Sequence, residues 1–153
     1  MSVSEWYEKK DGIAEHLVYL NKKASELEKL LNKSKTMIIR GAAGRKSPLG
    51  GRAKVGDYIY FVETNGNMLV SHRGIISKVI ESEKMTPEES INFVKKYEKE
   101  LNLSKDQYEK WAGKRYLAVY EISTIEKIEP FSYNREKNMD DWIITDDIKK
   151  IIK

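Results

Sequence analysis

The sequence has no cysteine and few of the other residues that build reactive centres. Its 153 residues include two histidines, His16 and His72, which lie far apart in the chain. The absence of cysteine excludes disulfides, thiolate nucleophiles and cysteine-ligated zinc or iron–sulfur centres. Two distant histidines do not match the pattern of a multi-histidine metal site. We therefore predict neither a metal site nor a cofactor.

Long hydrophobic runs are also missing. No segment approaches the roughly 20 consecutive apolar residues of a membrane-spanning helix, and residues 1–11 are polar, without an apolar run of signal-peptide length. These absences predict a soluble, cytoplasmic protein with no membrane partner. Hydrophobic residues still make up 40% of the chain, which is enough for one core, and the length predicts a single domain spanning residues 1–153.

Acidic residues are absent from one long window, between Glu28 and Asp57. Outside this window the chain has 20 lysines and arginines against 24 acidic residues, so the net charge of +4 is +8 in the window on a remainder of −4. Five of the nine glycines lie in the same window. Glycine-rich backbone N–H groups and long cationic side chains can approach a polyanion together. The eight cations are Lys29, Lys33, Lys35, Arg40, Arg45, Lys46, Arg52 and Lys54.

Strand and helix signals alternate in the first half of the chain. Residues 16–20 (HLVYL) are typical of a strand, although apolar residues at helical spacing over 13–31 also fit one long helix. A helix is predicted over 22–32, with Asn21 as its candidate cap. Further strands are predicted at 36–40, ended by Gly41, at 57–62, at 68–71 after an Asn-Gly turn at 65–67, and at 75–80 after a bulge at Gly74.

Two capping boxes mark helices in the second half. Thr86 with Glu89 predicts a helix that runs to about Glu100, and Ser104 with Gln107 predicts a shorter one. Gly113 ends the second helix. A long strand is predicted over 114–128 and stopped by Pro130, followed by a loop-like tail with a last helical turn at 146–152. Because βαβ units are absent, the pattern predicts a mostly antiparallel sheet or barrel with helices over its openings.

Several blocks resemble, in this order, the ASCH-type domains of the PUA-like superfamily. Residues 22–41 (KKASELEKLLNKSKTMIIRG) resemble their helix–turn–strand signature, and residues 53–62 (AKVGDYIYFV) resemble their Gly-Asp strand entry. The resemblance covers about residues 15–130 and favours a strand at 16–20. It implies an α+β fold: a PUA-like mixed, mostly antiparallel pseudo-barrel of five to six strands, with helices packed over its ends. Residues 131–153 would dock on the barrel as a tail. The remaining matching blocks are 74–82, 85–89 and 114–122.

The resemblance also implies a partner, because better-known members of the superfamily bind RNA or a modified nucleobase at one end of the barrel. We predict a non-catalytic, monomeric module for RNA or a modified nucleotide. Its Gly-rich loop 40–54 would hold phosphates, and a base would stack near the barrel mouth. Core packing of Trp111 and tail docking by Trp142 are the competing interpretations of those two residues. The predicted nucleic-acid-binding residues are Arg40, Arg45, Lys46, Arg52, Lys54, Arg73, Trp111 and Trp142.

An enzyme is the alternative. Some ASCH-type proteins resemble small amidohydrolases that act on acetylated cytidine through a Lys-Thr-x-Thr strand and a glutamate before a Met-Thr helix start. In this sequence Lys35 and Glu83 occupy the matching positions, but Ile38 stands in place of the second threonine. Thr36 lies on the same strand face and is the candidate replacement. Because isoleucine supplies no hydroxyl, the sequence favours binding over catalysis.

Overall fold

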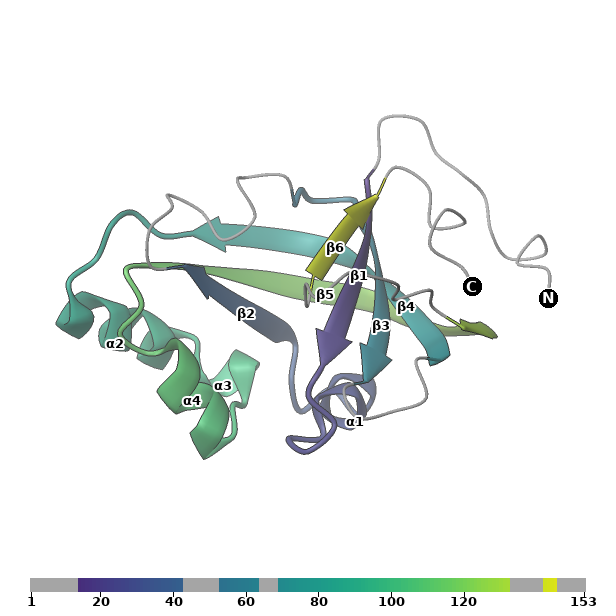
Figure 1. The fold of residues 1–153 in the computed structure, drawn as a ribbon, viewed down its shortest axis with the longest axis horizontal. Coiled ribbons are helices and arrows are strands. Elements are labelled where there is room, and N and C mark those ends of the chain that lie inside the picture. The colour runs from purple at the N-terminus through teal and green to yellow at the C-terminus, as the bar shows by residue number, and fades with distance from the viewer. Residues whose placement is uncertain (1–13, 43–52, 64–68, 133–141, 146–153) are drawn as a thin grey trace.

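The computed structural model describes residues 14–42, 53–63, 69–132 and 142–145, which form one mixed sheet with helices at its ends (Figure 1). The strand order is β2-β5-β4-β3-β1-β6. The β1–β3 pair is parallel and the other neighbouring pairs are antiparallel. This arrangement confirms the predicted α+β pseudo-barrel. The strands are β1 (Glu15–Leu20), β2 (Met37–Ala42), β3 (Tyr58–Glu63), β4 (Leu69–Glu81), β5 (Tyr116–Ser132) and β6 (Trp142–Thr145).

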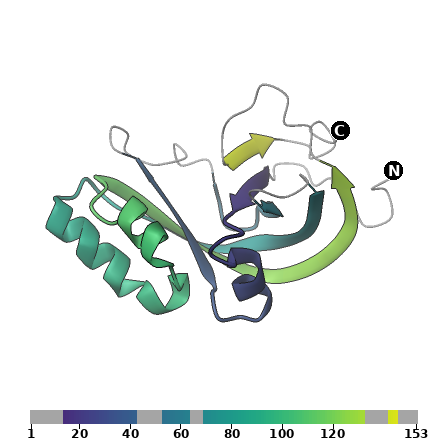
Figure 2. The same ribbon diagram turned by 60° about the horizontal axis from the view of Figure 1, so that its bottom comes forward.

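Three of the four helices lie together beside β2, and the first helix of the chain lies near the ends of β1 and β3 (Figures 1 and 2). Both capping boxes are confirmed, at Thr86 and at Ser104. The helix predicted to run to about Glu100 is interrupted at Tyr97. The helix predicted over 22–32 is shorter because residues 22–25 form turns, in which the Asn21 side chain accepts from the Ala24 N–H at 3.0 Å. The helices are α1 (Glu26–Leu31), α2 (Pro87–Lys96), α3 (Glu98–Leu101) and α4 (Lys105–Trp111).

Strand β1 settles the ambiguity at the start of the chain. All six of its residues are buried, because β3 pairs on one side, β6 on the other, and apolar clusters cover both faces. A strand buried on both faces is apolar at nearly every position. The apolar residues of β1 therefore include some at helical spacing by chance. The alternative prediction of one long helix over 13–31 is wrong.

Strand β2 separates two parts of the core. Its Ile38 faces the barrel interior, packing in a cluster with Phe61 and Tyr120. Its Met37 and Ile39 point the other way, into a cluster with residues of α2, α3 and α4. The alternation follows from the two-residue period of a strand. One face of β2 therefore lines the barrel interior, and its other face packs against α2, α3 and α4.

Two predicted strand ends are wrong. Strand β2 continues through Gly41 to Ala42, and a Cβ on Gly41 would lie 2.9 Å from Leu117 Cδ2 and 3.0 Å from Trp111 Cε3, so close packing requires the glycine. Strand β5 continues through Pro130 to Ser132. There β2 no longer pairs with β5, so the missing proline N–H interrupts no ladder on that side. The predicted bulge at Gly74 is confirmed by a register shift between Arg73 and Ile75.

The tail contains a strand that the sequence did not predict. Residues 142–145 form β6, which pairs antiparallel with β1 and opposes Trp142 to Val18. The loop-like interpretation of this stretch is wrong, because its hydrogen-bonding partner is more than 120 residues away in the chain. The predicted turns at 65–67 and 146–152 and the cations Arg45, Lys46 and Arg52 lie outside the described residues. Among the helices of the described ranges, none has the length and apolar character to cross a membrane.

Candidate nucleic-acid interface

Arg40 lies where β2 approaches β1 without pairing to it. Its Nη1 donates to the Ile39 carbonyl at 2.8 Å and its Nη2 to the Tyr19 carbonyl at 3.0 Å. Tyr19 is one residue past the end of the β1–β6 ladder, which stops at Val18. The guanidinium therefore bridges β2 and β1 at a point where, among the described residues, no strand pairing joins the two.

Two indoles flank this guanidinium. The Arg40 Cζ atom is 5.8 Å from the centroid of Trp111 and 5.6 Å from that of Trp142. Arg40 and Trp111 are each 8% exposed and Trp142 is 6% exposed. A cation over desolvated aromatic faces is worth about 2 kcal/mol. The predicted phosphate ligand and the two predicted stacking residues thus come together, but they contact one another inside the protein.

Trp142 also begins a buried hydrogen-bond chain. Its indole N–H donates to His16 Nδ1 at 3.0 Å, and His16 Nε2 lies 2.8 Å from Asp57 Oδ2. Because an indole N–H can only donate, His16 Nδ1 must accept, and Nε2 carries the proton that is donated to Asp57. The same Asp57 oxygen accepts from the Lys54 backbone N–H at 3.0 Å. The chain of contacts ties β6 and β1 to the turn before β3.

These contacts fix the two ends of the basic segment. On one side the described structure ends at Ala42, the last residue of β2 and two residues after Arg40. On the other side it resumes at Ala53, which is buried. Lys54 follows with its side chain exposed, while its N–H is held by Asp57. Both attachment points therefore belong to the framework around Arg40, Trp142 and Asp57.

Arg73 is engaged on the outside of β4. It forms an ion pair with Glu126, lies 4.9 Å over the Tyr58 ring and donates to the Tyr60 hydroxyl at 3.3 Å. Its charge is partly met by Glu126, which is half exposed. The structure does not bring Arg73 together with Arg40 and the two indoles.

The residues of the enzyme alternative divide into two places. Lys35 is almost completely buried, donating to the Leu101 carbonyl and lying 3.4 Å from Glu26 Oε2. Burial lowers the pKa of Lys35 from 10.5 to about 8, against the opposing effect of Glu26. Thr36 is adjacent to it. Glu83 is exposed. It lies at the far end of β2, because the N–H of the preceding residue, Ser82, donates to the Leu117 carbonyl, and Leu117 pairs with Gly41 of β2.

The separation of Lys35 from Glu83 is therefore about the length of β2. Six residues at about 3.3 Å each give roughly 20 Å along the strand. General acid–base work needs groups within hydrogen-bond reach of one reacting centre. The described arrangement does not assemble Lys35, Thr36 and Glu83 around one substrate.

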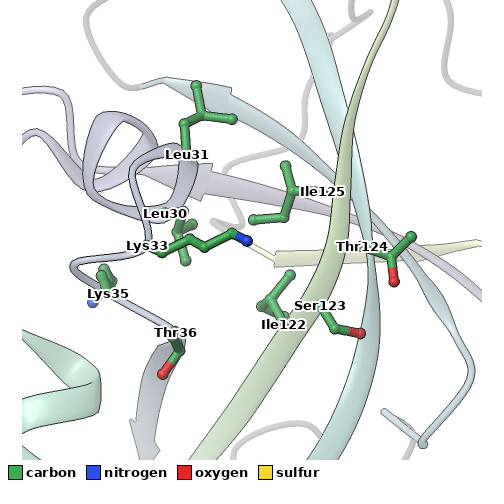
Figure 3. A pocket seen from close by; sticks show the side chains of 9 residues that line it. All are labelled: Leu30, Leu31, Lys33, Lys35, Thr36, Ile122, Ser123, Thr124 and Ile125. Carbon is green, nitrogen blue, oxygen red and sulfur yellow. The ribbon is translucent and has the colours of Figure 1, made fainter.

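A pocket of about 350 Å³ opens at the start of β2 (Figure 3). Helix α1 contributes Leu30 and Leu31, the following turn contributes Lys33, Lys35 and Thr36, and β5 contributes residues 122–125. Lys35 and Thr36 were candidate catalytic residues from the sequence, but a pocket beside them was not predicted. Thr124, which has a positive φ of 52°, lies in the register shift of β5 opposite Gly74.

Comparisons with known proteins support the architecture. No family model and no curated protein matches the chain. Among solved structures, an ASCH protein from Zymomonas mobilis superposes with a TM-score of 0.59 at 14% identity, covering 86% of this chain and 87% of that one. The chain has an ASCH-type, PUA-like fold. A tyrosine-to-phenylalanine mutant of the same Zymomonas mobilis protein gives a TM-score of 0.60 at 14% identity, covering 89% of this chain and 94% of that one.

Within this ASCH-type fold, two buried groups were not singled out as functional from the sequence. His16 links Trp142 to Asp57, and Tyr120, completely buried beside Trp142, has its hydroxyl without a hydrogen-bond partner in the described part of the chain. Burial raises the pKa of Tyr120, so this hydroxyl stays protonated. A buried unsatisfied hydroxyl is a place for an ordered water or a ligand atom. The environment of this hydroxyl depends on the contact between Tyr120 of β5 and Trp142 of β6, which are 22 residues apart in the chain and which no local sequence pattern joins.

Proposed function

We propose that this chain binds RNA or a modified nucleotide without catalysing a reaction on it, the phosphates being held by the basic Gly-rich segment 40–54. The support begins with charge. The window between Glu28 and Asp57 has a net charge of +8 on a chain whose remainder is −4. Clustered cations attract phosphates by releasing condensed counterions, without regard to sequence.

The observation that carries the proposal is the anchoring of this segment at both ends. Trp142, His16 and Asp57 form a buried chain that ends on the Lys54 N–H. Arg40, the first residue of the segment, is held by two carbonyl oxygens and two indoles. A basic segment attached to a buried framework at each end loses less conformational freedom on binding a polyanion than an unattached tail would.

Stacking of a base on Trp111 or Trp142 stays a prediction. Both rings are buried, and the Trp142 ring already contacts His16, Tyr120 and Arg40. A base could reach either indole only after one of these neighbours moved. We therefore assign the two indoles the role of shaping the barrel mouth around Arg40.

The double variant R45A/K46A tests the phosphate assignment. Loss of two phosphate contacts should weaken binding of a fluorescent oligouridine of about twelve nucleotides by roughly 10- to 30-fold at 0.1 M salt. The slope of log K against log salt should become shallower by about 1.4, since single strands contribute about 0.7 per contact. Fluorescence anisotropy over a series of salt concentrations measures both quantities.

The matched control is K95A/K99A, which removes two exposed lysines from α2 and α3. It changes the net charge equally and should leave the salt slope within about 0.3 of the parent value, because these lysines lie on the helical layer. If R45A/K46A and K95A/K99A weakened binding equally, the basic segment would have no special part in it. Unaltered binding in R45A/K46A would refute the assignment.

A further inference from the structure

Two lysines from the helical layer lie at the end of β2, where the basic segment 40–54 begins. Lys110 of α4 has its Nζ atom 4.8 Å from the centroid of the Trp111 ring. Lys114 follows the turn after α4, and its Cγ would lie 3.2 Å from a Cβ built on Gly41. Trp111 approaches the same position, with Cε3 at 3.0 Å. The two lysines and the indole between them in the chain therefore gather around Gly41.

The turn that carries Lys114 is held by hydrogen bonds. Gly113, with φ 99°, turns the chain at the end of α4. Its N–H donates to the hydroxyl of Ser90, a buried residue of α2, at 3.0 Å. The Lys114 N–H donates to the Trp111 carbonyl at 3.2 Å. Because the backbone is already ordered, a ligand that binds the Lys114 side chain does not have to order the turn.

The charges of both lysines are uncompensated in the described part of the chain. Neither Lys110 nor Lys114 forms an ion pair there. The exposed acidic residues Glu83 and Glu109 lie close in the fold or in the chain, but neither pairs with them. Arg115, which is exposed, adds a further cation directly after Lys114. These charges continue the positive potential of the basic segment onto α4, and such a field attracts an extended anion.

The aliphatic parts of the two side chains explain why lysine fits here. The Lys114 stem packs where Gly41 has no side chain, and Lys110 lies over an aromatic ring. Lysine can bury such a stem while its ammonium group stays in water. The ammonium group is a point charge that contacts phosphate without a fixed geometry. The arrangement therefore suits phosphates of a strand whose bases are not read.

We propose that Lys110 and Lys114 contact phosphates of an RNA strand that continues from the basic segment across the end of α4. The inference rests on the proposed function for the class of ligand. It adds a second group of phosphate contacts, made by described residues outside the window between Glu28 and Asp57, and the direction in which the strand leaves the segment.

The double variant K110M/K114M tests the inference without removing the packing. Methionine keeps an unbranched stem against Trp111 and Gly41, so the melting temperature should stay within about 3 °C of the parent value. Affinity for the twelve-nucleotide oligouridine should fall roughly 10- to 30-fold at 0.1 M salt, and the salt slope should become shallower by about 1.4. The variant K110R/K114R keeps both charges and should bind within about threefold of the parent protein.

The matched control is K99M/K105M, which removes two exposed lysines and the same net charge. Lys99 belongs to α3, which is tied to the start of β2 because the Thr36 N–H donates to the Glu100 carbonyl at 2.9 Å. Lys105 is about 8 Å from Lys110 along α4. This control should leave the salt slope within about 0.3 of the parent value. Equal weakening by K99M/K105M and K110M/K114M would overturn the inference, because only the net charge would then matter.

Comparison with R45A/K46A separates this inference from the proposed function. If R45A/K46A weakens binding and K110M/K114M does not, the strand does not cross α4, and the proposed function stands. If K110M/K114M weakens binding and R45A/K46A does not, the two lysines keep their role and the assignment of phosphates to the basic segment fails. A parent protein that does not bind the oligouridine would refute both.

Discussion

The free energy of unfolding should rise by about 2 kcal/mol between pH 7 and pH 9.5, because Lys35 is buried. Burial lowers its pKa in the folded protein to about 8 from its ordinary 10.5. The unfolded chain keeps the Lys35 proton until about pH 10.5, whereas the folded chain releases it near pH 8. Folding is therefore accompanied by proton release between these values, and stability increases as the pH rises through the window. At neutral pH the buried charge costs the fold about 3 kcal/mol of this possible stability.

Two buried tyrosines limit the rise at its upper end. Burial raises the pKa of both Tyr60 and Tyr120. The folded chain keeps their phenolic protons above pH 10, where the unfolded chain loses them, so stability falls as the pH increases further. The two effects together predict a maximum of stability between about pH 9 and pH 10.

Urea unfolding followed by far-ultraviolet circular dichroism at half-unit steps from pH 7 to pH 10.5 measures this profile. The double variant K35M/E26Q is the matched control. It removes both charges of the Lys35–Glu26 pair but keeps an oxygen that can accept from the Asn21 N–H, as Glu26 Oε1 does at 2.8 Å. Its profile should be flat below pH 9.5. A parent protein whose stability is constant or declines from pH 7 to pH 9.5 would show that Lys35 keeps an ordinary pKa.

Replacing Trp142 by alanine should destabilise the fold by about 3–5 kcal/mol, the range for large aromatic side chains removed from a core. The ring centroid lies 4.8 Å from that of Tyr120 and 5.7 Å from that of His16, and the Arg40 guanidinium lies over the same ring. The indole N–H is the hydrogen-bond donor to His16 Nδ1. Alanine therefore leaves a cavity, an unsatisfied imidazole nitrogen and an uncovered guanidinium at once.

The variant Trp142→Phe separates these contributions. Phenylalanine keeps most of the apolar contact but cannot donate to His16, so the cost should fall to about 1–3 kcal/mol, the range for one buried unsatisfied acceptor together with a small loss of volume. Urea midpoints for both variants against the parent protein give the two values. If alanine cost less than 1 kcal/mol, β6 would contribute little to the barrel, and the anchoring of Lys54 through His16 and Asp57 would have to be abandoned.

Local signals predicted much of this fold. The capping boxes at Thr86 and Ser104 involve residues three positions apart, and both are present. Gly74 marks a bulge because a residue without Cβ fits close to Ile122. Pro130 was misleading, because whether a proline stops a strand depends on whether its N–H would have had a partner. The pairing of β2 with β5 ends at Glu121, so no residue of β2 lies beside Pro130, and only the tertiary structure shows this.

The candidate site was predicted in part. The residues chosen for charge or aromatic character at the barrel mouth include Arg40, Trp111 and Trp142, and the structure places these three in mutual contact. Their burial was not predicted, because the sequence does not show that β2 and β1 approach each other at Arg40. The pocket beside Lys33 was missed because two stretches that lie far apart in the chain, 30–36 and 122–125, line it.

The amino-acid sequence by itself determined where α2 and α4 begin, the absence of thiol chemistry and the concentration of positive charge between Glu28 and Asp57. Each of these depends on residues near one another in the chain. Tertiary structure alone decided that Arg40 lies inside, that Trp142 belongs to a strand and that Lys35 holds its proton weakly. Those properties depend on desolvation and on partners brought together from distant parts of the chain, and neither is a property of a local segment.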